Sequence, residues 1–301
     1  MIGRRGEIAA QGSANVHKGA LDSTCYGDGT SPKEHLSMDR ARRLSALRRE
    51  RAQLIEFLSG LTADEWDAAS NADGWRVRDV IAHLGATTRA LLGPGMFQVL
   101  TSKNAEALNE AQVATRRDWP VEQVVAEFER TSGMAMQMLK VTSRQPLSSL
   151  RVPIAELGAY PMGLTPSLLI FDWHVHLRHD IAPALARPTV STDSERMAAV
   201  LEWMFAGLEQ MNRHTMAWVG WPVIVELTGV AGGRWRIDPR RRGRLRVTPH
   251  GDSRDVVVQI RGASSDFPMW ATTRTPWREA DLSISGDTAY ATRFLDSLNI
   301  V

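Results

Sequence analysis

Apolar residues recur at helical spacing through the first two thirds of the chain. Between residues 39 and 61, leucines and a phenylalanine recur every three or four positions among arginines and glutamates, which predicts an amphipathic helix. Thr62 can cap a short turn after it, and Thr165-Pro166 is a good helix start. Further helices are predicted at about residues 77–92, 120–141 and 165–185. Four such helices predict a helical bundle, with residues 153–161 as a plain connector.

The period of the pattern changes after about residue 190. A helix at about 196–215 is followed by short alternating or β-branched runs between Gly and Pro turns, which predict a short antiparallel sheet. The expected strands are residues 222–229, 233–239, 243–249, 255–262 and 281–286, with helices at 264–272 and 287–298. We therefore expect an α+β fold. Its expected parts are a flexible tail (1–37), a four-helix bundle (38–190) and a small α+β domain (191–301).

Composition and charge narrow the class of protein. A chain of 301 residues is long enough for two cores. The 36 basic and 34 acidic residues give a formal charge of +2, which is too small to indicate a nucleic-acid partner. No apolar run is long enough for a membrane span, and the N-terminus lacks the apolar core of a secretory signal, so a cytoplasmic protein is expected. The single cysteine, Cys25, excludes an intramolecular disulfide and a cysteine-rich zinc site.

Three side chains suggest a metal site. Asp172 and His176 are four residues apart in one predicted helix, so they share a helical face, with Cβ atoms about 5–6 Å apart. Carboxylate and neutral imidazole are ligands that zinc accepts. His83, in the second predicted helix, would complete a set of three protein ligands, which leaves one position open as in catalytic zinc sites. A lone helical histidine is more often a packed residue than a ligand, so spacing supports only the Asp172–His176 pair.

Three separated motifs resemble one known family. The segment GWRVRDVIAHL, with Trp75, Val77, Asp79, His83 and Leu84, resembles the second-helix signature of the DinB-like, mycothiol-dependent maleylpyruvate isomerase family. The segment DWHVHLRHDIAPALARP from Asp172 resembles its other hallmark. In the C-terminal half, GGRWRIDP, GASSDFPMWATTR and ADLSISGDTAY follow in the order of the family's small α/β domain, which is likened to sterol carrier proteins. The resemblance covers about residues 40–301.

The resemblance implies a metal centre that activates a thiol. It implies His83, Asp172 and His176 as metal ligands, Zn²⁺ as the divalent metal, and mycothiol, the sugar-linked thiol of actinobacteria, as cosubstrate. A metal stabilises thiolate over thiol, and the thiolate is the nucleophile. The expected function is therefore a thiol S-transferase or a maleylpyruvate-type cis-trans isomerase. The alternatives are a non-catalytic metal-binding or regulatory protein of the same fold, and a metal-assisted hydrolase. A small-molecule thiol and an electrophile are the expected partners, without nucleic acid or membrane, and a homodimer is left open.

The chain departs from the family pattern near the expected ligands. Asp172 stands where isomerase members have Glu, and the usual H-x2-D spacing is one residue longer between His176 and Asp180. Either the helix contains a one-residue irregularity, such as a π-bulge, or Asp180 has lost its usual role. His179 then becomes a rival ligand.

One arginine is the candidate catalytic residue outside the bundle. Arg274 matches an arginine that the resemblance implicates in activity, and a guanidinium suits a substrate carboxylate. The alternative is a surface arginine at a helix end. Family members have Gly before this arginine, whereas this chain has Thr273, so the local turn is open. The basic run at 239–246 is interpreted as a charged hairpin tip rather than a nucleic-acid patch.

Overall fold

The computed structural model describes residues 38–300, which belong to one compact unit. The predicted tail at residues 1–37 and Cys25 lie outside the described residues. The order of elements is a helical part followed by a sheet with its own helices, so the predicted α+β class is confirmed. No helix among the described residues is both long and apolar enough to cross a membrane.

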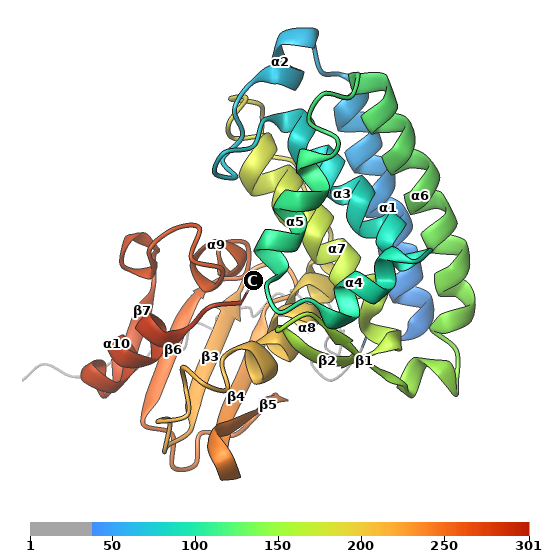
Figure 1. The fold of residues 1–301 in the computed structure, drawn as a ribbon. Helices are drawn as coiled ribbons and strands as arrows, with labels where there is room; N and C mark the ends of the chain where they lie inside the picture. Colours follow the sequence, from blue (N-terminus) through green and yellow to red (C-terminus); the bar gives the residue numbers. More distant parts are fainter. Residues whose placement is uncertain (1–37, 301) are drawn as a thin grey trace, which may run out of the picture. The chain divides into compact units, whose positions relative to one another are not determined.

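Four helices form the bundle, and their apolar faces meet in its core (Figure 1). They are α1 (Arg40–Ser59), α3 (Val77–Leu91), α6 (Val121–Thr142) and α7 (Thr165–Val175). The helix α3 packs against α6, and α1 packs against α6 and α7. Asp39 caps α1, and the short α2 (Ala63–Asp67) begins with a capping box between Thr62 and Glu65. The four helices predicted from periodicity are therefore confirmed.

Two short helices were not predicted between α3 and α6. They are α4 (Gly95–Thr101) and α5 (Ala105–Ala114). Asn104 caps α5 by accepting a hydrogen bond from the backbone N–H of Ala107 at 2.8 Å. Only Val113 of α5 is buried, so its sequence lacks the apolar stripe by which the other helices were recognised.

The prediction of a plain connector at residues 153–161 is wrong. The chain forms an antiparallel hairpin of β1 (Arg151–Ile154) and β2 (Gly158–Pro161), with Arg151 opposite Pro161. Proline is disfavoured in central strands but is tolerated at sheet edges. Because both strands of a two-stranded ribbon are edges, Pro153 and Pro161 are accommodated here.

The helix that carries Asp172 changes its pitch directly after α7. Residues His176–Ile181 form a π-helix (η3), in which the N–H of Ala182 donates to the carbonyl of Leu177 at 3.0 Å. The N–H of Asn71 donates to the carbonyl of Asp180, and the Asn71 side-chain amide donates to that of His179, both at 2.9 Å. Of the two alternatives left by the sequence, the local irregularity is therefore the one found.

A five-stranded sheet follows α8 (Ser194–Met211) in the order β5-β4-β3-β6-β7. Its strands are β3 (Val223–Thr228), β4 (Gly233–Arg240), β5 (Arg244–Pro249), β6 (Val258–Ala263) and β7 (Ser283–Gly286). The prediction of an antiparallel sheet is wrong at one pairing, because β3 and β6 run parallel. After β5 the chain returns past β4 and β3 before it forms β6, and alternation of side chains carries no information on strand direction.

The remaining elements are helices around these two parts. They are α9 (Phe267–Ala271), α10 (Thr288–Ser297) and the 3₁₀ turns Leu147–Ser149, Met162–Leu164, Arg241–Gly243 and Trp277–Glu279. The helix α8 contacts α1, α7 and β5, and Phe205 on it stacks on Trp235 of β4 and on Phe267, with ring centroids 4.2 and 5.0 Å apart. Because α8 packs on both parts, the boundary near residue 190 stays a prediction.

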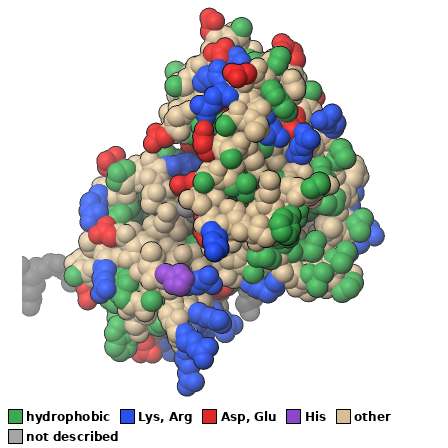
Figure 2. Space-filling view, viewed as in Figure 1, with side chains coloured by type: hydrophobic (Ala, Val, Ile, Leu, Met, Phe, Trp, Pro, Cys, Tyr) green, Lys and Arg blue, Asp and Glu red, His purple; other side chains and the backbone are tan. Residues whose placement is uncertain are grey.

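The basic run at 239–246 lies at the tip of the β4–β5 hairpin. Its arginines are exposed, and Lys and Arg side chains gather at the lower edge of the space-filling view, over this hairpin (Figure 2). The interpretation as a charged hairpin tip is therefore confirmed.

Candidate metal centre and its cavity

The three expected ligands lie together at one point between α3, α7 and η3. Nε2 of His83 is 3.5 Å from Oδ1 of Asp172, and Nε2 of His176 is 3.6 Å from the same oxygen. One ligand atom from each residue lies within 4.8 Å of the others. Bonds of about 2.1 Å in tetrahedral geometry place neighbouring ligand atoms about 3.4 Å apart. The two measured separations from Asp172 therefore suit atoms that share one ion.

The local structure explains how these side chains are presented. Asp79 at the start of α3 accepts hydrogen bonds from the backbone N–H of Arg76 at 3.0 Å and from its side chain at 2.9 Å. This buried contact fixes the first turn of α3, and His83 lies one turn further along the same face. Asp172 lies one turn before the pitch changes at His176.

Charge and burial favour an ionised carboxylate between the two histidines. Burial acts to raise the pKa of Asp172, but His83 and His176 together lower it below its usual value. Oδ2 of Asp172 and Nδ1 of His83 are buried and have no hydrogen-bond partner among the described residues. Buried polar groups are rarely left unpaired. A cation bound by this cluster would compensate the carboxylate, so the residues fit a divalent metal.

Asp180 supports the cluster from behind. Its Oδ2 is 2.7 Å from Nδ1 of His176, the ring nitrogen that faces away from Asp172. Burial acts to raise the pKa of Asp180, but contacts with His176 and Arg274 lower it to about 2. A carboxylate on the second ring nitrogen fixes the tautomer and orientation of a ligating histidine. His176 and Asp180 are therefore in contact although the π-helix places one more residue between them than the family pattern has.

The rival ligand His179 lies outside the cluster. Its ring centroid is 6.3 Å from that of His174, and burial lowers its pKa to about 4. Among the described residues, the only group of three ligand-type side chains close enough to share an ion is His83, Asp172 and His176.

Arg274 approaches the same cluster from the turn after α9. Its Nε and Nη2 each lie 3.1 Å from an oxygen of Asp180, and Nη1 donates to the hydroxyl of Thr272 at 3.0 Å. Thr273 has a φ of +59°, a left-handed conformation that favours glycine. The turn expected for the Gly-Arg pair is thus formed with threonine. A contact of Arg274 with substrate stays a prediction.

Trp75 covers the histidines and was not predicted as a site residue. Its ring centroid is 5.2 Å from that of His83 and 6.4 Å from that of His176. Its Nε1 donates to Glu110 of α5 at 2.8 Å. Trp75 lies in the same sequence segment as His83, and this proximity could have indicated that it belongs to the site.

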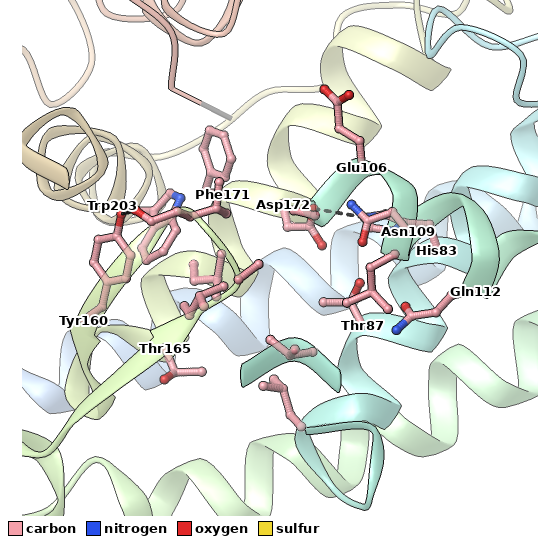
Figure 3. Close-up of a pocket in the computed structure, with 18 of the residues that line it drawn as sticks. His83, Thr87, Glu106, Asn109, Gln112, Tyr160, Thr165, Phe171, Asp172 and Trp203 are labelled. Atoms are coloured by element: carbon pink, nitrogen blue, oxygen red, sulfur yellow. Dashed lines mark hydrogen bonds and ion pairs between the residues drawn. The ribbon is translucent and has the colours of Figure 1, made fainter. Parts of the chain in front are cut away.

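The cluster opens into a cavity of about 660 Å³. The residues that line it come from α3, α5, the β1–β2 hairpin, α7 and the turn at Arg274. Figure 3 shows Glu106, Asn109 and Gln112 of α5 on one side of Asp172 and Tyr160, Phe171 and Trp203 on the other. The contribution of α5 was not predicted. The Asn104 cap and the Ala- and Glu-rich run after it could have revealed this helix.

Comparison with known proteins gives one family match and a similar fold. Residues 47–182 match the family model described as the mycothiol maleylpyruvate isomerase N-terminal domain. The crystal structure of the mycothiol-dependent maleylpyruvate isomerase aligns with a TM-score of 0.53 at 18% identity. That of a mutant with one histidine replaced by alanine aligns with a TM-score of 0.53 at 17% identity. Each alignment covers 83% of this chain and 95% of the other. The search of curated proteins gave no match.

Proposed function

We propose that this protein is a metal-dependent enzyme that uses mycothiol, since residues 47–182 match the model of the mycothiol maleylpyruvate isomerase N-terminal domain and the chain shares the fold of that isomerase. The observation that supports this most strongly is the cluster of His83, Asp172 and His176 at the cavity. It combines two imidazoles and one carboxylate, a ligand set that leaves room for an exogenous ligand.

The proposed metal is Zn²⁺, held by His83, Asp172 and His176. A bound divalent ion would favour the thiolate over the thiol of the cosubstrate. Asp180 holds His176 in position through Nδ1. Arg274 donates hydrogen bonds to Asp180 and Thr272. Its remaining guanidinium N–H groups lie at the cavity wall, where they would donate to an oxygen of the substrate.

The chemical step is addition of the thiolate to an electrophilic carbon. With an activated alkene, a sulfur–carbon bond forms and the π electron pair moves to the adjacent carbon. In transfer, that carbon takes a proton and the adduct is the product. In isomerisation, the adduct rotates about the former double bond and expels the thiolate, which restores the alkene.

Metal content and thiol consumption test this proposal together. We expect purified protein to contain about one divalent ion per chain by elemental analysis, and to consume mycothiol with an electrophile faster than a His176→Ala variant. His214→Ala, at an exposed histidine outside the cavity, is the control and should match the unmodified protein. Absence of metal from the unmodified protein would refute the proposal. Bound metal without thiol consumption would favour a regulatory protein, and turnover without thiol would favour a hydrolase.

A further inference from the structure

The two sides of the cavity differ in chemistry. On the α5 side, Glu106, Asn109 and Gln112 present carboxylate and amide groups. The opposite side presents the rings of Tyr160, Phe171 and Trp203 in Figure 3, together with aliphatic side chains. Aliphatic residues that line the cavity include Ile154, Leu157 and Leu168, and the carbonyl of Leu157 accepts the hydrogen bond of the Tyr160 hydroxyl. An apolar ligand group that extends past Asp172 to this wall would therefore be transferred from water to an apolar environment, which favours its binding.

The charges around the cavity oppose an anionic ligand. Besides Asp172, whose charge the proposed metal would balance, three carboxylates line it, from Asp73, Glu106 and Glu110, against the single guanidinium of Arg274 among the described lining residues. That guanidinium already forms two hydrogen bonds to Asp180 and one to Thr272. With the charge of the proposed divalent metal shared between Asp172 and the thiolate, the two negative charges of a dicarboxylate would find only part of the Arg274 guanidinium to receive them.

The polar groups of the apolar wall are not available to a ligand. The Tyr160 hydroxyl donates to the carbonyl of Leu157 at 2.7 Å, so its proton is already used. Nε1 of Trp203 is buried and has no acceptor among the described residues. The wall therefore offers an anionic ligand neither a cation nor a free, accessible hydrogen-bond donor.

We propose that the electrophile accepted by this site is an uncharged, largely apolar molecule, bound against the wall formed by Tyr160, Phe171 and Trp203. The inference rests on the proposed function and narrows it to addition of the thiol to uncharged acceptors rather than to dicarboxylates. The polar α5 side is then left for the hydroxylated part of the thiol, since carboxylates and amides bind hydroxyl groups well.

Binding of unreactive analogues tests the inference without any turnover. Diethyl succinate and succinate share a carbon skeleton but differ in charge, and neither contains the alkene that reacts with thiols. By calorimetric titration of the full-length, metal-loaded protein, we expect the diester to bind at least about tenfold more tightly, a difference of about 1.4 kcal/mol. Equal or tighter binding of succinate would overturn the inference.

A charge placed on the apolar wall provides a second measurement. In Leu157→Lys, a new cation lines the cavity, and the preference for the diester should fall at least about tenfold. Val141→Lys adds the same charge at a position that is 57% exposed and outside the cavity, and should leave the preference unchanged. An equal effect of both variants would contradict binding at this wall.

Turnover separates the inference from the proposed function. With mycothiol present, diethyl maleate should be consumed with a larger enzymatic acceleration over the uncatalysed reaction than maleate. Thiol consumption with maleate preferred would overturn the inference and leave the proposed function intact. A preference for the diester in binding without any thiol consumption would support the ligand class and count against the proposed function.

Discussion

Asp180 holds two residues from distant parts of the chain at once. One of its oxygens contacts His176, and both face the guanidinium of Arg274. Substitution by asparagine keeps the shape of the side chain but removes its charge. Two contacts that depend on that charge are then weakened together.

We therefore expect Asp180→Asn to weaken metal binding about 10–100-fold, because supporting carboxylates contribute by this amount to metal affinity. A competition titration with a chromophoric chelator measures the change. Asp64→Asn, at an exposed position in α2, should bind metal as the unmodified protein does. Unchanged affinity in Asp180→Asn would show that the contact with His176 does not support the cluster.

Thr273 is a β-branched residue in a left-handed conformation, with a φ of +59°. This conformation costs roughly 1–2 kcal/mol for residues other than glycine. We expect Thr273→Gly to raise the free energy of unfolding by about 1 kcal/mol, as measured by urea denaturation. Thr115 has an ordinary φ of −70°, so glycine relieves no strain at this position. Thr115→Gly should therefore lower the free energy of unfolding, because glycine increases the conformational entropy of the unfolded chain. A loss in both variants would contradict strain at Thr273.

At the scale of elements, the π-helix behaves as an α-helix with one residue inserted. Deletion of His179 would restore the spacing H-x2-D between His176 and the aspartate, and residues three apart also share a helical face. We expect this deletion variant to stay folded by circular dichroism and to bind metal within about tenfold of the unmodified protein. Deletion of Val175, between Asp172 and His176, changes the spacing of the ligands themselves and should abolish metal binding. Equal loss in both would show that the π-helix is indispensable.

The elements that could be predicted from the sequence are those that bury a periodic face. The helices α1, α3 and α6 carry such a face, whereas α7 is buried on most sides and was indicated by its Thr165-Pro166 start. The spacing of Asp172 and His176 follows directly from the helical conformation of α7. The helix α5 and the β1–β2 hairpin bury few side chains, so their sequences carry little periodic signal. The pairing of β3 with β6 depends on the path of the chain after β5. The contact of Arg274 with Asp180 is likewise set by tertiary packing.

At the scale of the whole molecule, Glu127 of α6 ties two other segments to the bundle. Its carboxylate accepts hydrogen bonds from Arg116 at 3.0 Å and from Arg89 of α3 at 2.9 Å. Burial acts to raise the pKa of Glu127, but these arginines lower it below the value of 4.5 expected in an unfolded chain. Its contribution to stability is therefore present above about pH 4.5 and is lost as the pH falls through the lowered folded-state value.

We expect Glu127→Gln to lower the free energy of unfolding by about 3 kcal/mol at pH 7, because it leaves two arginines without their anion. The difference from the unmodified protein should shrink as the pH falls below about 4.5 and through the lowered folded-state pKa of Glu127, because the protonated carboxyl carries no charge, as the glutamine amide does. Urea denaturation across this range measures it. Glu122→Gln, at an exposed position of the same helix, is the control. A difference that does not change with pH would contradict an ionic contribution.

The hydrogen bonds between Asp180 and Arg274 join residues 94 positions apart. The helical part therefore does not form a self-contained metal-binding unit. Asp180, which contacts His176, is neutralised by Arg274 from the C-terminal part of the chain. A chimera that replaces the C-terminal segment would inherit an unbalanced carboxylate beside the metal cluster. In recombination between relatives, Asp180 and Arg274 would have to be exchanged as a pair.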